Sequence, residues 1–184
     1  MTDPVYIVLC RTRTVLSRTI HVITREPFTH SGLAFTPELD PMFSFGRLKP
    51  RNPFIGGFKH ERLDDDFYRH YTDLPGLVMA LTVTADQRQR LEALVDQFNA
   101  QPERYGYNYF GLAGNLFGRS YQNPTRFFCS EFVYYVLHES GISDLGKPPC
   151  EVHPSDLRQL GGETIFEGNL MTYHAALHSH RNRT

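Results

Sequence analysis

The apolar positions of the chain fall into short runs that predict strands in its first half. Residues 4–10 (PVYIVLC) form a continuous apolar run with β-branched side chains, which is typical of a buried strand. Further short strands are predicted at residues 28–36, 42–47, 77–83 and 163–167. The Pro- and Gly-rich segment 49–57 breaks this pattern, and we expect it to be a loop.

A spacing of three and four residues between apolar side chains predicts the helices. The clearest helix is residues 85–100, which Thr84 or Asp86 can cap at its start. Its apolar stripe consists of Leu91, Leu94, Val95 and Phe98. Other helices are predicted at residues 14–25, 127–140 and 154–160. The polar tail from about His174 is expected to be loose, and residues 1–184 are expected to form one α+β domain.

Cys129 lies near the start of the predicted helix 127–140, which Thr125 or Asn123 can cap. At about 100° per residue, Cys129 is at the centre of the apolar stripe, and Glu131 points the opposite way, where it would anchor the helix. The dipole and free N–H groups of a helix start favour a thiolate and can bind an oxyanion. The alternative is that Cys129 is a small buried hydrophobe, as free cysteine often is.

His30 lies on a predicted strand face whose other side chains are small. The two-residue period of a strand places His30 on the same face as Gly32, and places Ser44 beside Gly46 on the next strand. If the two strands pair, these faces can coincide. The small neighbours leave room for a substrate or a packed helix beside the imidazole. The alternative is a hydrogen-bonded histidine of the core or rim.

Composition and charge narrow the class of protein. The net charge is −1, from 19 basic and 20 acidic residues, which predicts neither a nucleic-acid footprint nor a polybasic patch for lipid. The N-terminus carries only six apolar residues in a row, too few for a secretory signal or a membrane span, so we expect a cytoplasmic protein without stable membrane insertion. The cysteines form neither a zinc pair nor a disulfide framework, and they are Cys10, Cys129 and Cys150. We expect no metal and no cofactor.

Four segments carry a more specific pattern: FTHSGLAF, MFSFGR, YGYNYFGL and FFCSEFVYYVL. Together they resemble the circularly permuted NlpC-type papain-like cysteine hydrolases, the YiiX-like proteins related to lecithin–retinol acyltransferase. The last segment, a CSE motif that opens an apolar helix, is the most specific of the four. The order, histidine first and cysteine last, is the permuted order. The resemblance covers about residues 4–140 and implies an α+β papain-like fold, with an antiparallel sheet packed against the helix that bears the nucleophile.

The resemblance also implies roles for individual residues. Cys129 matches the nucleophile and His30 its base. Ser44 falls where the family places a polar orienting residue, usually His, Glu or Gln. Serine can accept a hydrogen bond from the imidazole but carries no charge to stabilise an imidazolium. Tyr107 and Tyr109 precede the nucleophile, in a stretch where a hydroxyl could help to bind the oxyanion or the substrate.

The expected reaction is hydrolysis of an amide bond, in a peptide or a cell-wall-type substrate, through a cysteinyl acyl-enzyme. A related hypothesis is a cysteine acyltransferase or thioesterase, whose acyl pocket the Phe-rich segments would line. A hypothesis from a different class is a non-catalytic binding module that retains the papain-like fold, and the serine at position 44 favours it. The expected ligand is a small molecule, a peptide or an acyl compound.

Overall fold

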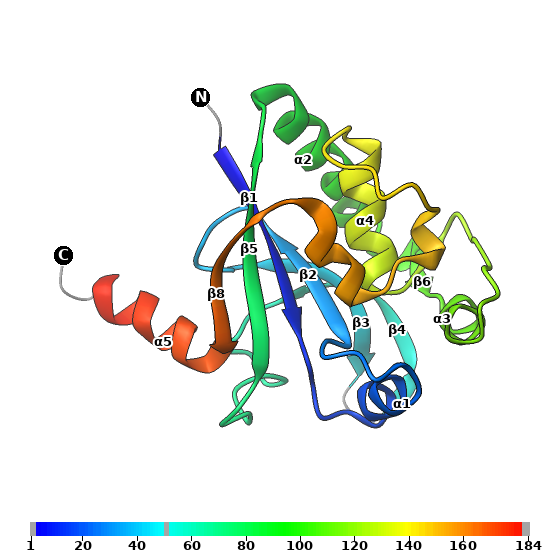
Figure 1. Cartoon of the computed structure of the whole chain (residues 1–184), viewed down its shortest axis with the longest axis horizontal. Coiled ribbons are helices and arrows are strands. Elements are labelled where there is room, and N and C mark those ends of the chain that lie inside the picture. Colours follow the sequence, from blue (N-terminus) through cyan, green and yellow to red (C-terminus); the bar gives the residue numbers. More distant parts are fainter. Residues whose placement is uncertain (1–2, 50–51, 182–184) are drawn as a thin grey trace.

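One mixed β-sheet forms the centre of an α+β fold (Figure 1). The computed structural model describes residues 3–49 and 52–181. The order of the strands across the sheet is β7-β6-β4-β3-β2-β1-β5-β8. In chain order the strands are β1 (Asp3–Cys10), β2 (His30–Ala34), β3 (Met42–Lys49), β4 (Asn52–Glu61), β5 (Pro75–Val83), β6 (Gly106–Tyr107), β7 (Arg126–Phe127) and β8 (Glu163–Asn169).

Neighbouring strands are antiparallel except at one edge, where β6 and β7 are parallel. The sheet is therefore mixed and not purely antiparallel as expected from the sequence. The two strands predicted to pair do so, because Leu33 of β2 lies opposite Phe43 of β3. This pairing brings the small-residue faces of β2 and β3 together.

The helices lie on both sides of the sheet and at its ends. They are α1 (Val15–Thr24), α2 (Ala85–Ala100), α3 (Tyr109–Leu116), α4 (Cys129–Glu139) and α5 (Leu170–Arg181), with 3-10 turns η1 (Pro102–Arg104), η2 (Pro149–Glu151) and η3 (Pro154–Leu160). Helices α2 and α4 pack side by side on one face of the sheet (Figure 1). Their core is rich in aromatic rings, and Phe132 of α4 packs on Phe45 of β3 with 5.3 Å between ring centroids. A second, smaller core covers the opposite face.

The predicted helix 85–100 and its cap are both present. The Thr84 hydroxyl accepts a hydrogen bond from the Gln87 N–H at 3.2 Å, and the Gln87 side chain accepts one from the Thr84 N–H at 3.0 Å. This reciprocal pair is a capping box, which satisfies two donors at the helix start.

The expected caps of α4 are wrong. Strand β7 intervenes, so that the helix begins at Cys129 and not at residue 127. Asn123 accepts hydrogen bonds from the N–H and hydroxyl of Thr125 and does not reach the helix. Instead, the Glu131 carboxylate accepts the Phe128 N–H at 3.1 Å, which fits its expected role as an anchor.

Segment 49–57 was expected to be a loop, but from Asn52 onward it belongs to strand β4. Its glycines permit close packing and do not mark a turn. A Cβ on Gly56 would lie 2.8 Å from the Tyr107 Cβ, and one on Gly57 would lie 2.8 Å from the Tyr105 carbonyl oxygen. Glycine is therefore needed where β4 meets β6.

The tail was expected to be loose from about His174, but α5 continues to Arg181. Asn169 fixes the start of this helix, because its side-chain oxygen accepts hydrogen bonds from the N–H groups of Leu74 and Met171. Leu170 is fully buried in the second core. These contacts supply an anchor that the polar composition of the tail does not reveal.

Candidate functional site

Cys129 and His30 meet where two elements begin. His30 is the first residue of β2 and Cys129 is the first residue of α4. Their side chains are hydrogen-bonded to each other. The structure therefore brings the thiol and the imidazole together, as the sequence predicted for a nucleophile and its base.

A buried carboxylate, Glu61, holds the other side of the imidazole. The Nε2–H of His30 donates to Glu61 Oε2 at 2.8 Å. Because Nε2 faces Glu61, Nδ1 is the nitrogen left for the sulfur of Cys129. Glu61 ends β4 and lies opposite Met42 of β3, so the sheet itself fixes the position of the carboxylate. Only 3% of the Glu61 side chain is exposed.

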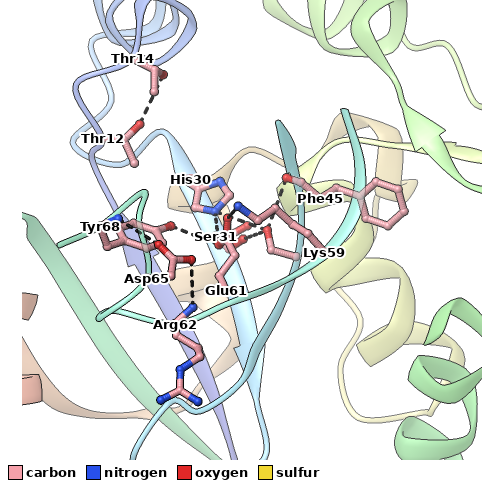
Figure 2. A network of polar contacts seen from close by, with 11 residues as sticks. Thr12, Thr14, His30, Ser31, Phe45, Lys59, Glu61, Arg62, Asp65 and Tyr68 are labelled. Atoms are coloured by element: carbon pink, nitrogen blue, oxygen red, sulfur yellow. Dashed lines mark hydrogen bonds and ion pairs between the residues drawn. The ribbon is translucent and has the colours of Figure 1, made fainter. Parts of the chain in front are cut away.

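Two further side chains converge on Glu61 (Figure 2). Lys59 lies with its Nζ 3.1 Å from Glu61 Oε1, and the Tyr68 hydroxyl donates to Oε2 at 3.1 Å. Three donors thus satisfy the carboxylate, which is the condition for keeping a charge in the interior. Glu61 is therefore held rigidly against His30.

These neighbours set the ionisation of the site. Burial opposes the charge on Glu61, but His30 and Lys59 outweigh it and lower the pKa of Glu61 to about 2. Burial also disfavours the imidazolium, but Glu61 and Cys129 outweigh it and raise the pKa of His30 to about 10. Burial opposes the thiolate of Cys129, and its hydrogen bond to His30 overcomes this and lowers the pKa of Cys129. The lowered pKa of Cys129 and the raised pKa of His30 both favour the thiolate–imidazolium form of the pair.

Backbone groups also stabilise the Cys129 sulfur. The N–H groups of Ser31 and Ser130 hydrogen-bond to it and lower its pKa further. Ser130 lies in the first turn of α4, where N–H groups have no intrahelical partner and the helix dipole favours negative charge. Cys129 is 5% exposed and the His30 side chain 15%, so water screens these charges weakly.

Ser44 lies beside His30 but is not its closest partner. The Ser44 Oγ is 3.4 Å from His30 Nε2, whereas Glu61 is 2.8 Å from the same nitrogen. The hydroxyl of Ser44 donates instead to the Ser31 carbonyl at 2.8 Å. Serine at position 44 was expected to be the orienting residue, and in the structure the charged partner of the imidazole is Glu61.

The two tyrosines of the YGYNYFGL segment differ in their position. Tyr107 is buried, and its pKa is raised well above 10 by burial and then by the nearby Cys129 thiolate. Tyr109 stacks on Tyr107 with 4.6 Å between ring centroids and lies beside Arg47 and Gly56. Tyr107 is therefore close enough to Cys129 for the two groups to interact electrostatically, and Tyr109 contacts Tyr107.

The other cysteines lack these activating contacts. Burial and Glu61 raise the pKa of Cys10, and burial raises the pKa of Cys150. Cys129 is the only cysteine whose pKa is lowered. Within residues 3–49 and 52–181, no cluster of His, Cys, Asp and Glu side chains could hold a metal ion.

Sequence reasoning missed Glu61 because it treated 49–57 as a loop and did not extend a strand through the residues that follow. Read as a strand, FKHE alternates Phe58 and His60 with Lys59 and Glu61. This alternation puts a carboxylate on the face that Ser44 and His30 share. The alternation is visible in the sequence, but its alignment with Ser44 and His30 depends on the register of β4 on β3.

The described helices include none that is both long and apolar enough to cross a bilayer. Family models, curated proteins and solved structures were all compared with the chain, and none of them matches it.

Proposed function

We propose that this chain is a cysteine hydrolase of the permuted papain-like type, which cleaves an amide bond through a cysteinyl acyl-enzyme. One observation carries the proposal: a thiol at the start of a helix, an imidazole and a buried carboxylate form one hydrogen-bonded series, Cys129–His30–Glu61. Thiolate chemistry needs a neighbouring base and a group that orients that base, and this series supplies both.

In acylation, the Cys129 thiolate attacks the carbonyl carbon of the substrate. The carbon–sulfur bond forms as the carbonyl π electrons move to oxygen, and N–H groups of the first turn of α4 would bind the oxyanion. The intermediate then collapses, the carbon–nitrogen bond breaks, and the imidazolium of His30 gives its proton to the leaving amine.

In deacylation, the now neutral imidazole of His30 takes a proton from water. The hydroxide attacks the thioester, the carbon–sulfur bond breaks, and the acid product leaves Cys129 as the thiolate. Glu61 acts through His30, because its negative charge stabilises the imidazolium in both steps. Ser44 carries no charge to stabilise the imidazolium, and Glu61 supplies that charge.

Acyl transfer, or thioester cleavage on an acyl or lipid substrate, is the second candidate function. The observation that favours it is a pair of exposed aromatic side chains, Phe110 and Phe117, on and beside α3. Helix α3 follows directly after Tyr107, which lies near the Cys129 sulfur. An apolar acyl chain would find contacts there.

The test begins with iodoacetamide at neutral pH and mapping of the adduct by mass spectrometry. We expect selective labelling of Cys129 over Cys10 and Cys150, with loss of labelling in His30→Asn and no loss in the control His60→Asn. His60 binds Asn99 at an exposed position and makes a matched histidine control. Incubation with amides, esters and thioesters should then yield an acyl adduct on Cys129. Equal labelling of the three cysteines, together with no adduct, would favour the binding module.

A further inference from the structure

Large apolar side chains are exposed mainly on three segments of the chain. Phe110 is 85% exposed, and Phe117 and Val22 are each 75% exposed. Among the described residues, seven of the eight most exposed large apolar side chains belong to α1, to the β3–β4 hairpin, or to α3 and the chain after it. These seven are Val22, Ile23, Leu48, Ile55, Phe110, Phe117 and Tyr121.

The three segments adjoin in space. Helix α1 packs against α3, and β4 pairs with β6, which leads directly into α3. The Tyr109 hydroxyl at the start of α3 approaches Gly56 of β4. Figure 1 shows α1, α3 and the β3–β4 pair together at the end of the molecule remote from α5. We call this region the α1–α3 surface.

The sequence in and around these segments is mainly basic. Residues 11–25, 44–60 and 104–130 contain eleven arginines and lysines and no aspartate or glutamate, and the acidic residues that adjoin these ranges are Glu26, Glu61, Glu103 and Glu131. The rest of the chain contains eight basic and twenty acidic residues. The net charge of −1 therefore averages a basic region with an acidic one, and the absence of a polybasic patch expected from it holds only for the whole chain.

Two hollows lie beside these segments. A cavity of about 180 Å³ next to α1 has a polar, mainly basic lining that includes Arg11, Arg13, Arg18, His21 and Asp73. Asp73 lies 3.9 Å from the Arg13 guanidinium, and Glu26 at the end of α1 faces His153. A second hollow, of about 480 Å³, is lined by Phe117, Arg119, Ala113 and Gly114.

We propose that the α1–α3 surface adsorbs to an anionic lipid bilayer without crossing it. Exposed apolar side chains flanked by arginines are the pattern by which helices lie in a membrane interface, with the apolar groups among the acyl chains and the cations at the headgroups. Anionic lipids attract basic segments that lie close to the membrane. The basic residues of the α1–α3 surface are thus complementary in charge to the headgroups of an anionic bilayer.

Adsorption does not require the proposed hydrolysis. It would, however, bring the chain on both sides of Tyr107 close to the membrane, and Tyr107 precedes α3 and interacts electrostatically with Cys129. A substrate drawn from the bilayer would reach the site from this side.

The experiment is cosedimentation of the full chain with vesicles of phosphatidylcholine alone or mixed with phosphatidylserine. We expect binding to the mixed vesicles, weak binding to phosphatidylcholine, and loss of binding as salt rises. In the double variant Phe110→Ser/Phe117→Ser, the partition coefficient onto the mixed vesicles should fall at least about tenfold. The control Ile165→Ser removes an exposed apolar side chain on β8, outside the α1–α3 surface, and should bind like wild type.

Equal binding to both kinds of vesicle, or unchanged binding by the double variant, would overturn the proposal. Light scattering tests one alternative. If the wild-type chain is a dimer, the double variant is a monomer and neither binds vesicles, the α1–α3 surface joins two copies of the chain and the membrane proposal is wrong. The measurement uses no turnover, so failure of the proposed function would leave its result unaffected. Circular dichroism of each variant verifies that the exposed substitutions leave the fold intact.

Discussion

Charges alternate in sign along the site, from the Lys59 ammonium through Glu61 and His30 to the Cys129 thiolate. Each group lies beside one of opposite charge, and burial alone opposes the charged forms of Glu61, His30 and Cys129. Glu61 can act on the Cys129 thiol through His30, which it holds and charges. We therefore expect Glu61 to set the reactivity of the thiol.

Glu61→Gln tests this dependence. Glutamine keeps the shape but removes the charge, so the imidazolium loses its main support and the thiolate fraction falls. We expect the alkylation rate of Cys129 at neutral pH to fall about a hundredfold, and Ser44→Ala to change it much less. Iodoacetamide kinetics read by mass spectrometry give both rates. An equal fall of the alkylation rate in the two variants would indicate that Ser44 orients His30 as much as Glu61 does.

The pH dependence of alkylation is a second test at the same scale. Because the pKa of Cys129 is lowered, its thiolate forms at a more acidic pH than that of an ordinary thiol. We expect the rate–pH profile of wild type to lie on the acid side of the profile of urea-unfolded protein. In His30→Gln, burial still raises the pKa of Cys129 but the imidazole no longer lowers it, so the rate–pH profile should move to the alkaline side. A profile that His30→Gln leaves in place would contradict the pairing.

Single residues also mark the limit of what the sequence could predict. Cys129 and His30 were recognisable because each lies in a local pattern, an apolar helix stripe and a strand of small residues. Glu61 acquires its meaning from the register of β4 on β3, a contact between residues distant in sequence. Ser44 lies on the expected face, but its hydroxyl donates its hydrogen bond to the Ser31 carbonyl.

At the scale of elements, the start of α4 depends on a second buried carboxylate. Glu131 is almost fully buried and accepts hydrogen bonds from the Phe128 N–H and the Asn108 side chain. Burial raises the pKa of Glu131 to about 7 in spite of these donors. Local periodicity predicted helices α2 and α4 closely, but it could not show that the carboxylate on the far face of α4 is inside the protein.

Glu131→Gln tests the energetic cost of this charge. A pKa raised from 4.5 to about 7 means that ionisation of Glu131 removes stability as pH rises through that range. Relative to wild type, the variant should therefore gain up to about 3 kcal/mol between pH 4 and pH 8. Glu139→Gln, an exposed position on the same helix, should show no such trend. Urea unfolding at several pH values gives the difference, and a variant whose relative stability falls with pH would refute the sign.

At the scale of the whole molecule, one sheet separates two cores. The larger core underlies α2 and α4, and the smaller one includes Leu170 at the start of α5. The polar composition of the tail does not reveal this second core, because the contacts that dock α5 come from a few residues, among them Leu170, Asn169 and Tyr173. The α+β class followed from the order of the elements, whereas the docking of the last helix did not.

Leu170→Ala measures how much the smaller core contributes to the free energy of unfolding. Leu170 is fully buried against Gly76, so its truncation should leave a cavity and reduce the free energy of unfolding by about 2–4 kcal/mol. The exposed Ile165→Ala should change it by less than about 0.5 kcal/mol. Thermal and urea unfolding provide both numbers, and a neutral Leu170→Ala would mean that α5 contributes little to the fold.

The site joins the first residue of β2 to the first residue of α4, and this order has a consequence during synthesis on the ribosome. The histidine and its carboxylate lie in the first 61 residues, and the sulfur follows only at position 129. Domains fold as units once enough of the chain has emerged. We therefore expect the thiol to acquire its lowered pKa only when α4 docks beside β2, after the histidine and the carboxylate have already left the ribosome.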